Sequence, residues 1–65
     1  MDRYVYHIYL KTEQSYITVF GTRIIFDQYT IHIIDNDENN EIKGEAWFYL
    51  DNIIGFTSER LRKDL

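Results

Sequence analysis

The 65-residue chain contains no cysteine, so disulfide bonds cannot contribute to its stability. This absence fits a reducing compartment. The longest apolar run, residues 46–50, is far shorter than the roughly 20 residues of a transmembrane helix. The first residues, Met-Asp-Arg-Tyr, lack the apolar segment of a secretory signal peptide. We therefore expect a cytoplasmic protein that does not associate with a membrane.

Glycine and histidine are also scarce, which limits the chemistry that the chain can support. The three glycines stand apart, so no glycine-rich phosphate loop is present. His7 and His32 have no local spacing that pairs them, and no cysteine completes a metal site. Turn and cap chemistry explains Ser15 and Ser58, and so short a chain can hardly build the deep cleft that paired carboxylates need. We expect no enzymatic activity, no cofactor and no metal.

Aromatic side chains, in contrast, are abundant. They make up 17% of the chain, and each buries a large area, which helps a domain of marginal size to form a core. The same residue types are enriched at protein interfaces. We therefore expect residues 1–65 to form a single folded β domain.

The net charge of −4 is distributed unevenly along the chain. Residues 1–26 and the last nine residues each carry +1, whereas residues 27–51 carry seven acidic side chains against Lys43. Direct binding of nucleic-acid phosphates by this middle region is disfavoured, because phosphate contacts need Lys and Arg. The acidic residues indicate either a negative lobe that attracts basic surfaces or charges that keep an aromatic protein soluble.

The hydrophobic pattern has a period of two, which is typical of β-strands. Strands are predicted at residues 3–11, 16–20, 23–26, 29–34, 42–50 and 53–56, separated by polar turns. The first strand is apolar on both faces, so it is either central and covered or part of an interface. Its faces consist of Tyr4, Tyr6, Ile8 and Leu10 on one side and Val5, His7 and Tyr9 on the other.

This pattern predicts a mainly β fold, an antiparallel meander of five or six strands. The meander forms either an open sheet or a small SH3-like or OB-like barrel. Thr57 or Ser58 is a candidate N-cap for a short helix over residues 57–65, which frays unless it docks. In the strand over residues 42–50, the pattern places Gly44, Ala46 and Phe48 inward with Ile42 and Leu50, and Lys43, Glu45, Trp47 and Tyr49 outward.

Residues 35–41 form a loop without any apolar side chain, and their spacing invites comparison with a calcium loop. Asp35, Asp37, Asn39 and Glu41 occupy the first, third, fifth and seventh positions of an EF-hand loop. However, Asn40 replaces the required glycine, the twelfth position is not Glu, and the flanking segments are strands. The pattern favours a solvated hairpin loop.

The outward side chains meet in one aromatic patch if all the strands share one sheet. This patch is either an interaction surface or a part of the core that the C-terminal segment covers with Leu61 and Leu65. The residues that would meet are Val5, His7, Tyr9, His32, Ile34, Trp47 and Tyr49.

Three segments within residues 24–56 carry a resemblance to a class of known proteins. The segments are IFD at 25–27, IHIID at 31–35 and FYLDNIIGF at 48–56. Their pattern resembles small all-β accessory proteins encoded by phages or prophages of Gram-positive bacteria. The resemblance implies a mobile-element protein that binds and redirects a host protein or nuclease. It includes no catalytic or ligand motif.

These observations lead to one main hypothesis and two alternatives. The main hypothesis is a non-catalytic module that binds and inhibits a host protein, such as a nucleic-acid-binding enzyme, through an acidic lobe and an aromatic strand face. The alternatives are a homo-oligomer, such as a homodimer, assembled through its first strand, and a small barrel that stacks single-stranded nucleic acid, which the acidic charge opposes. The predicted partner-binding residues are Tyr9, His32, Trp47, Tyr49, Asp35, Asp37, Glu38, Glu41 and Glu45.

Overall fold

A computed structural model describes residues 2–12 and 14–61, and these residues form six strands and one short 3-10 helix. The elements are β1 (Arg3–Leu10), β2 (Tyr16–Gly21), β3 (Arg23–Phe26), β4 (Thr30–Asn36), β5 (Ile42–Tyr49), η1 (Leu50–Asn52) and β6 (Ile53–Leu61). The mainly β fold class that the sequence predicts is confirmed. Within the described ranges, no helix has the length and apolar character that crossing a membrane requires.

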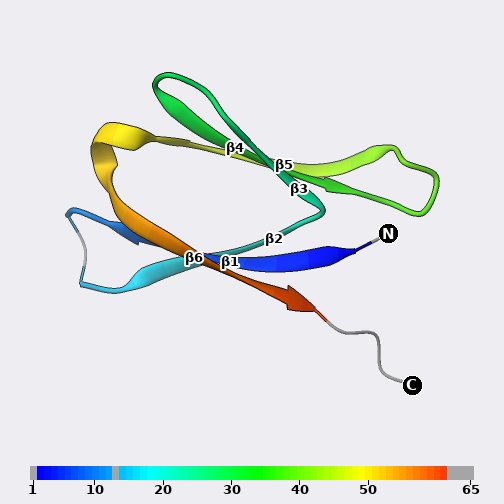
Figure 1. Cartoon of the computed structure of the whole chain (residues 1–65), viewed down its shortest axis with the longest axis horizontal. Helices are drawn as coiled ribbons and strands as arrows, with labels where there is room; N and C mark the ends of the chain where they lie inside the picture. The colour runs from blue at the N-terminus through cyan, green and yellow to red at the C-terminus, as the bar shows by residue number, and fades with distance from the viewer. Residues whose placement is uncertain (1, 13, 62–65) are drawn as a thin grey trace.

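The strands form two antiparallel sheets of three strands each, in the orders β2-β1-β6 and β3-β4-β5. The two sheets lie one above the other in Figure 1, and the chain crosses between them at the β2–β3 corner and again at η1. Among the described residues, no strand ladder joins one sheet to the other. Of the two predicted arrangements, the structure therefore has the open one, but as two layers rather than as a single sheet.

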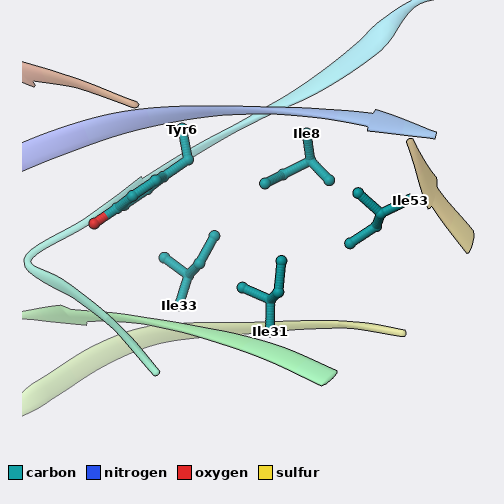
Figure 2. Close-up of a cluster of buried hydrophobic side chains, with 5 residues drawn as sticks. All are labelled: Tyr6, Ile8, Ile31, Ile33 and Ile53. Atoms are coloured by element: carbon teal, nitrogen blue, oxygen red, sulfur yellow. The ribbon is translucent and has the colours of Figure 1, made fainter. Parts of the chain in front are cut away.

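The core lies between the two layers. Ile31 and Ile33 on β4 point towards Tyr6 and Ile8 on β1 and towards Ile53 at the start of β6 (Figure 2). The period-two pattern explains this arrangement, since alternate residues of a strand share one face. Burial, together with the neighbouring phenol of Tyr4, raises the pKa of Tyr6. Six half-buried side chains surround the cluster: Tyr4, Leu10, Val19, Ile24, Phe48 and Phe56.

Gly21 and Thr22 form the corner at which the chain passes from one sheet to the other. Gly21 lies so close to β4 that a Cβ atom there would be 2.6 Å from Ile33 Cγ2 and 3.0 Å from the Ile34 carbonyl oxygen. The Thr22 backbone N–H donates to the same carbonyl oxygen at 2.8 Å. The backbone N–H of Asn36 donates to the Thr22 hydroxyl at 3.1 Å. The corner is thus fastened to the end of β4.

An ion pair also links the start of β1 to β4 in the other layer. Arg3 donates from Nε to Asp35 Oδ1 at 3.2 Å and from Nη2 to Asp35 Oδ2 at 2.9 Å. The Asp35 side chain is only 11% exposed, and Lys43 Nζ lies 3.8 Å from its Oδ2. The Arg3 guanidinium lies over the Phe20 ring, 5.2 Å from the ring centroid. The buried carboxylate needs these partners, because an unpaired charge in the interior is costly.

The prediction of a C-terminal helix is wrong over residues 57–61. These residues continue β6, in which Thr57 pairs with His7, Ser58 with Tyr6 and Glu59 with Val5. The cap chemistry of Thr and Ser is a local preference, and the ladder with β1 overrides it by satisfying the backbone groups of the whole segment. Residues 62–65, including Leu65, lie outside the described residues.

The boundary of the acidic loop also differs from the prediction. Asp35 and Asn36 belong to β4 and pair with Gly44 and Ile42 of β5, with an irregularity in register between them. The predicted alternation of β5 is confirmed for Gly44, Ala46 and Phe48, which are half-buried, whereas Ile42 beside the irregularity is exposed. The loop between the strands therefore begins at Asp37.

Replacement of Gly21 tests the corner. We expect Gly21→Ala to lower the free energy of unfolding by about 1–3 kcal/mol, because the added methyl group meets the Ile34 backbone and the core side chain of Ile33. Gly55→Ala is the matched control, since a Cβ there meets no atom within 4 Å. Urea denaturation of both variants measures the difference. Equal losses for the two variants would contradict a steric role for Gly21.

A second pair of variants tests the ion pair between the layers. We expect Arg3→Gln to lower the free energy of unfolding by about 1–3 kcal/mol, because it leaves the buried Asp35 carboxylate with only the more distant Lys43. Arg60→Gln is the control: its pair with Asp2 is also 2.9 Å long, but the two side chains are 65% and 55% exposed. That loss should stay below about 1 kcal/mol. Urea denaturation measures both losses. A similar loss of unfolding free energy in the two variants would show that burial of the Arg3–Asp35 pair does not increase its contribution to stability.

Candidate protein-binding surface

Four of the predicted partner-binding residues lie together on the outer surface of the β3-β4-β5 sheet. His32 on β4 pairs with Ile25 on β3 and with Trp47 on β5, so these three residues form a row across the sheet. Glu45 and Tyr49 flank Trp47 along β5 and share its face through the two-residue period. We call this surface the Trp47 face; it consists of Ile25, His32, Glu45, Trp47 and Tyr49.

The large side chains of the Trp47 face are strongly exposed. Trp47 is 59% exposed and Tyr49 is 67% exposed, and Ile25 is also exposed. Ile34, which follows His32 on the same face of β4, is buried. Leu61, which the sequence offered as a cover, is at the end of β6 in the other sheet. Within the described chain, no segment of the other sheet folds over these aromatic rings, and such exposure is typical of an interaction surface.

The His32 imidazole packs against one face of the Trp47 indole. The His32 and Trp47 rings are nearly parallel, with centroids 4.1 Å apart and an interplanar angle of 11°. His32 Nε2 is buried, lies 3.5 Å from Glu45 Oε2 and makes no hydrogen bond within the described residues. Because the imidazole covers one face of the indole, the exposed area of Trp47 lies on its other face and its edges.

Tyr9 lies on the outer surface of the other sheet. Its ring centroid is 5.4 Å from that of Tyr16 on β2, and His7 packs edge-on against Tyr16 at 4.6 Å. We call this surface the Tyr16 face; it consists of His7, Tyr9 and Tyr16. The single patch that would unite Tyr9 with Trp47 does not form, because their strands belong to different sheets whose outer surfaces point in opposite directions (Figure 1).

The apolar pattern on both faces of β1 follows from its central position. One face forms the core, and on the other face Val5 is buried while Tyr9 is exposed. β1 pairs with β2 along one edge and with β6 along the other. Both edges of β1 are thus occupied within the chain itself. Two copies therefore cannot add their first strands edge to edge, and only the Tyr16 face remains for a contact through this strand.

The exposed acidic residues do not form one lobe. Glu38 and Glu41 lie in the loop that joins β4 to β5, whereas Asp27 and Asp51 lie at the opposite end of the same sheet (Figure 1). β4, which runs between the two ends, has seven residues, so the ends are about 20 Å apart. Glu45 of the Trp47 face lies between them. The acidic lobe of the sequence prediction is thus two acidic ends with an aromatic surface between them.

Two predicted acidic residues have roles inside the fold. The Asp35 carboxylate is held by Arg3, and its side chain is only 11% exposed. Asp37 Oδ1 accepts from the backbone N–H of Asn39 at 2.9 Å and from that of Glu41 at 3.0 Å, which closes the loop. Glu38 and Glu41 are exposed, and their carboxylates accept no hydrogen bond within the described residues.

Charge is partitioned between the two layers. Residues 22–52, which include the β3-β4-β5 sheet, carry seven acidic side chains against Arg23 and Lys43, a net charge of −5. The described residues of the other layer carry Arg3, Lys11 and Arg60 against Asp2 and Glu59, a net charge of +1. The Trp47 face therefore belongs to the layer that attracts positively charged surfaces.

The other surface features of the described residues provide fewer groups that are free to bind a ligand. A shallow hollow is lined by Thr22, Arg23, Asn36, Asn40 and Ile42. Its Thr22 and Asn36 side chains already bond to each other at 2.9 Å, as part of the corner. His7 and His32 lie on the outer surfaces of different sheets, and no three His, Cys, Asp or Glu side chains within the described ranges gather closely enough to hold a metal ion.

Two members of these surfaces were missed in the sequence-based site. Ile25 was assigned to a strand, and the same alternation that places Ile24 towards the core places Ile25 outside. Tyr16 begins a segment in which Tyr16, Thr18 and Phe20 alternate with the core residue Val19. The period-two signal was present in both cases, but the pairing partners, which lie far away in sequence, were not known.

Comparisons with known proteins identify no relative of this chain. No protein-family model matches the chain, and no curated protein or solved structure is significantly similar to it. The surfaces described above are therefore interpreted from their own geometry and chemistry.

Proposed function

We propose that this chain is a non-catalytic protein-interaction module that docks on a partner through the Trp47 face. The observation that carries the proposal is the pair Trp47 and Tyr49, which are 59% and 67% exposed on one sheet surface. Aromatic residues at the centre of an interface contribute much of its binding energy when a partner covers them. The acidic ends on either side supply the polar rim that such an interface has.

The charge of this layer supports one kind of partner over others. A net charge of −5 over residues 22–52 favours encounter with a positively charged protein surface and opposes binding of nucleic-acid phosphates. The partner that we propose is a host protein with a basic surface, such as an enzyme that handles nucleic acid, whose activity the bound chain would inhibit. The resemblance of residues 24–56 to phage or prophage accessory proteins supports a bacterial host and a role for a mobile element.

Capture experiments with matched variants test the proposal. The variant Trp47→Ser/Tyr49→Ser removes the aromatic rings of the Trp47 face, and Tyr9→Ser/Tyr16→Ser removes two rings from the opposite face. Capture from a Gram-positive bacterial lysate at low salt, followed by binding of the identified, purified protein, measures the effect. We expect the first variant to weaken binding more than about tenfold, the cost of losing an aromatic hot spot, and the second to bind like the wild type.

Two outcomes would contradict this proposal. Equal loss in both variants would show that the Trp47 face has no special role. A wild-type dimer in light scattering that Trp47→Ser/Tyr49→Ser converts to a monomer would assign the face to self-association instead.

A further inference from the structure

The open side of the Trp47 indole has the features of a binding site for a cation. His32 covers one ring face at a centroid distance of 4.1 Å, and because Trp47 is still 59% exposed, its other face is accessible. Among the aromatic side chains, the indole binds cations on its face most strongly. Because the stack with His32 already holds the indole in place, a ligand would need to restrict little side-chain motion.

A carboxylate lies within reach of the same position. Glu45 is two residues before Trp47 on the same face of β5, and their Cα atoms are therefore roughly 6.5–7 Å apart. Within the described residues, Glu45 has no Lys or Arg partner, and the His32 imidazole is the one ionisable group in contact with its carboxylate. A cationic side chain on the open face of the indole can pair with the Glu45 carboxylate once Glu45 rotates away from His32, whose Nε2 lies 3.5 Å from its Oε2.

The position is accessible from the edge of the sheet. β5 pairs with β4 on one side, and in the described residues no strand pairs with its other side. Tyr49 lies two residues beyond Trp47, so Glu45, Trp47 and Tyr49 form a line along this edge strand. A partner can therefore reach Trp47 without displacing any part of the described chain.

We infer that the Trp47 face anchors an arginine side chain of a basic protein partner. The guanidinium group stacks on the open face of Trp47 and forms an ion pair with Glu45. Arginine fits better than lysine, because its planar group both stacks on an aromatic ring and bonds a carboxylate through a fork of N–H donors. This inference rests on the proposed function and specifies the chemistry of the partner at one point of the interface.

Trp47 is the sole tryptophan of the chain, so its fluorescence reports directly on this position. The probes are short peptides in which glycine alternates with arginine, with lysine or with glutamine, titrated at physiological ionic strength. We expect the arginine peptide to change the fluorescence at severalfold lower concentration than the lysine peptide, and the glutamine peptide to have no effect. Equal responses to arginine and lysine would overturn the stacked geometry.

Matched variants separate a local contact from general attraction. Glu45→Gln should weaken binding of the arginine peptide about two- to fivefold, as expected for one exposed ion pair. Glu38→Gln makes the same charge change in the loop beyond β4, more than a Debye length of roughly 8 Å away, and should have a much smaller effect. Equal weakening by the two variants would show that the peptide senses only net charge and would overturn the inference.

A labelled arginine peptide followed by fluorescence anisotropy allows Trp47 itself to be replaced. Trp47→Leu should weaken binding about three- to tenfold, the range of a cation–π contact, while circular dichroism confirms that the variant is folded. Unchanged binding in this folded variant would overturn the inference. So would an oligodeoxythymidine that quenches Trp47 as strongly as the arginine peptide, because that result would assign the ring to nucleic-acid stacking.

The proposed function and this inference fail in different ways. If the host partner still binds Trp47→Ser/Tyr49→Ser, the proposed function fails whatever the peptides do. If that variant loses the partner but the arginine peptide shows no preference over lysine and no dependence on Glu45, the face is an interface and only the arginine anchor is wrong.

Discussion

The close approach of Gly21 to β4 is the constraint on which most of this structure depends. With no Cβ atom at this position, the backbone lies directly against Ile33 and the Ile34 carbonyl group, and Thr22 then bonds the same carbonyl. Since β2 pairs with β1 while β3 pairs with β4, this corner fixes how the two sheets lie relative to each other. It thereby brings Ile31 and Ile33 against Tyr6 and Ile8 to form the core.

The two-layer arrangement explains why so many aromatic residues remain exposed. Each sheet has one inner face, and the small space between the sheets holds only the side chains on those two faces. A short chain also buries a smaller share of its surface than a long one. The apolar side chains on the outer faces therefore have no core to enter. On the β3-β4-β5 sheet these side chains include Trp47 and Tyr49.

The sequence predicts the strands well, because their signal is local. The period of two identifies all six strands at least in part, and it correctly places Trp47 and Tyr49 outside and Phe48 inside. The division into two sheets depends on pairing between distant segments, such as β1 with β6, and a local pattern does not contain that information. For the same reason the local pattern groups Tyr9 with Trp47 and makes Thr57 or Ser58 a helix cap.

The acidic residues show a similar division between local and distant causes. The role of Asp37 in closing its loop follows from the tendency of Asp to bond backbone N–H groups two residues on. The burial of Asp35 depends on Arg3, which is 32 residues away in sequence. Because Arg3 neutralises Asp35, the negative charge of the β3-β4-β5 layer comes from the exposed acids at the two ends of the sheet and from Glu45 between them. If the partner has a basic surface, as we propose, attraction by both ends centres that surface on Glu45, which lies beside Trp47.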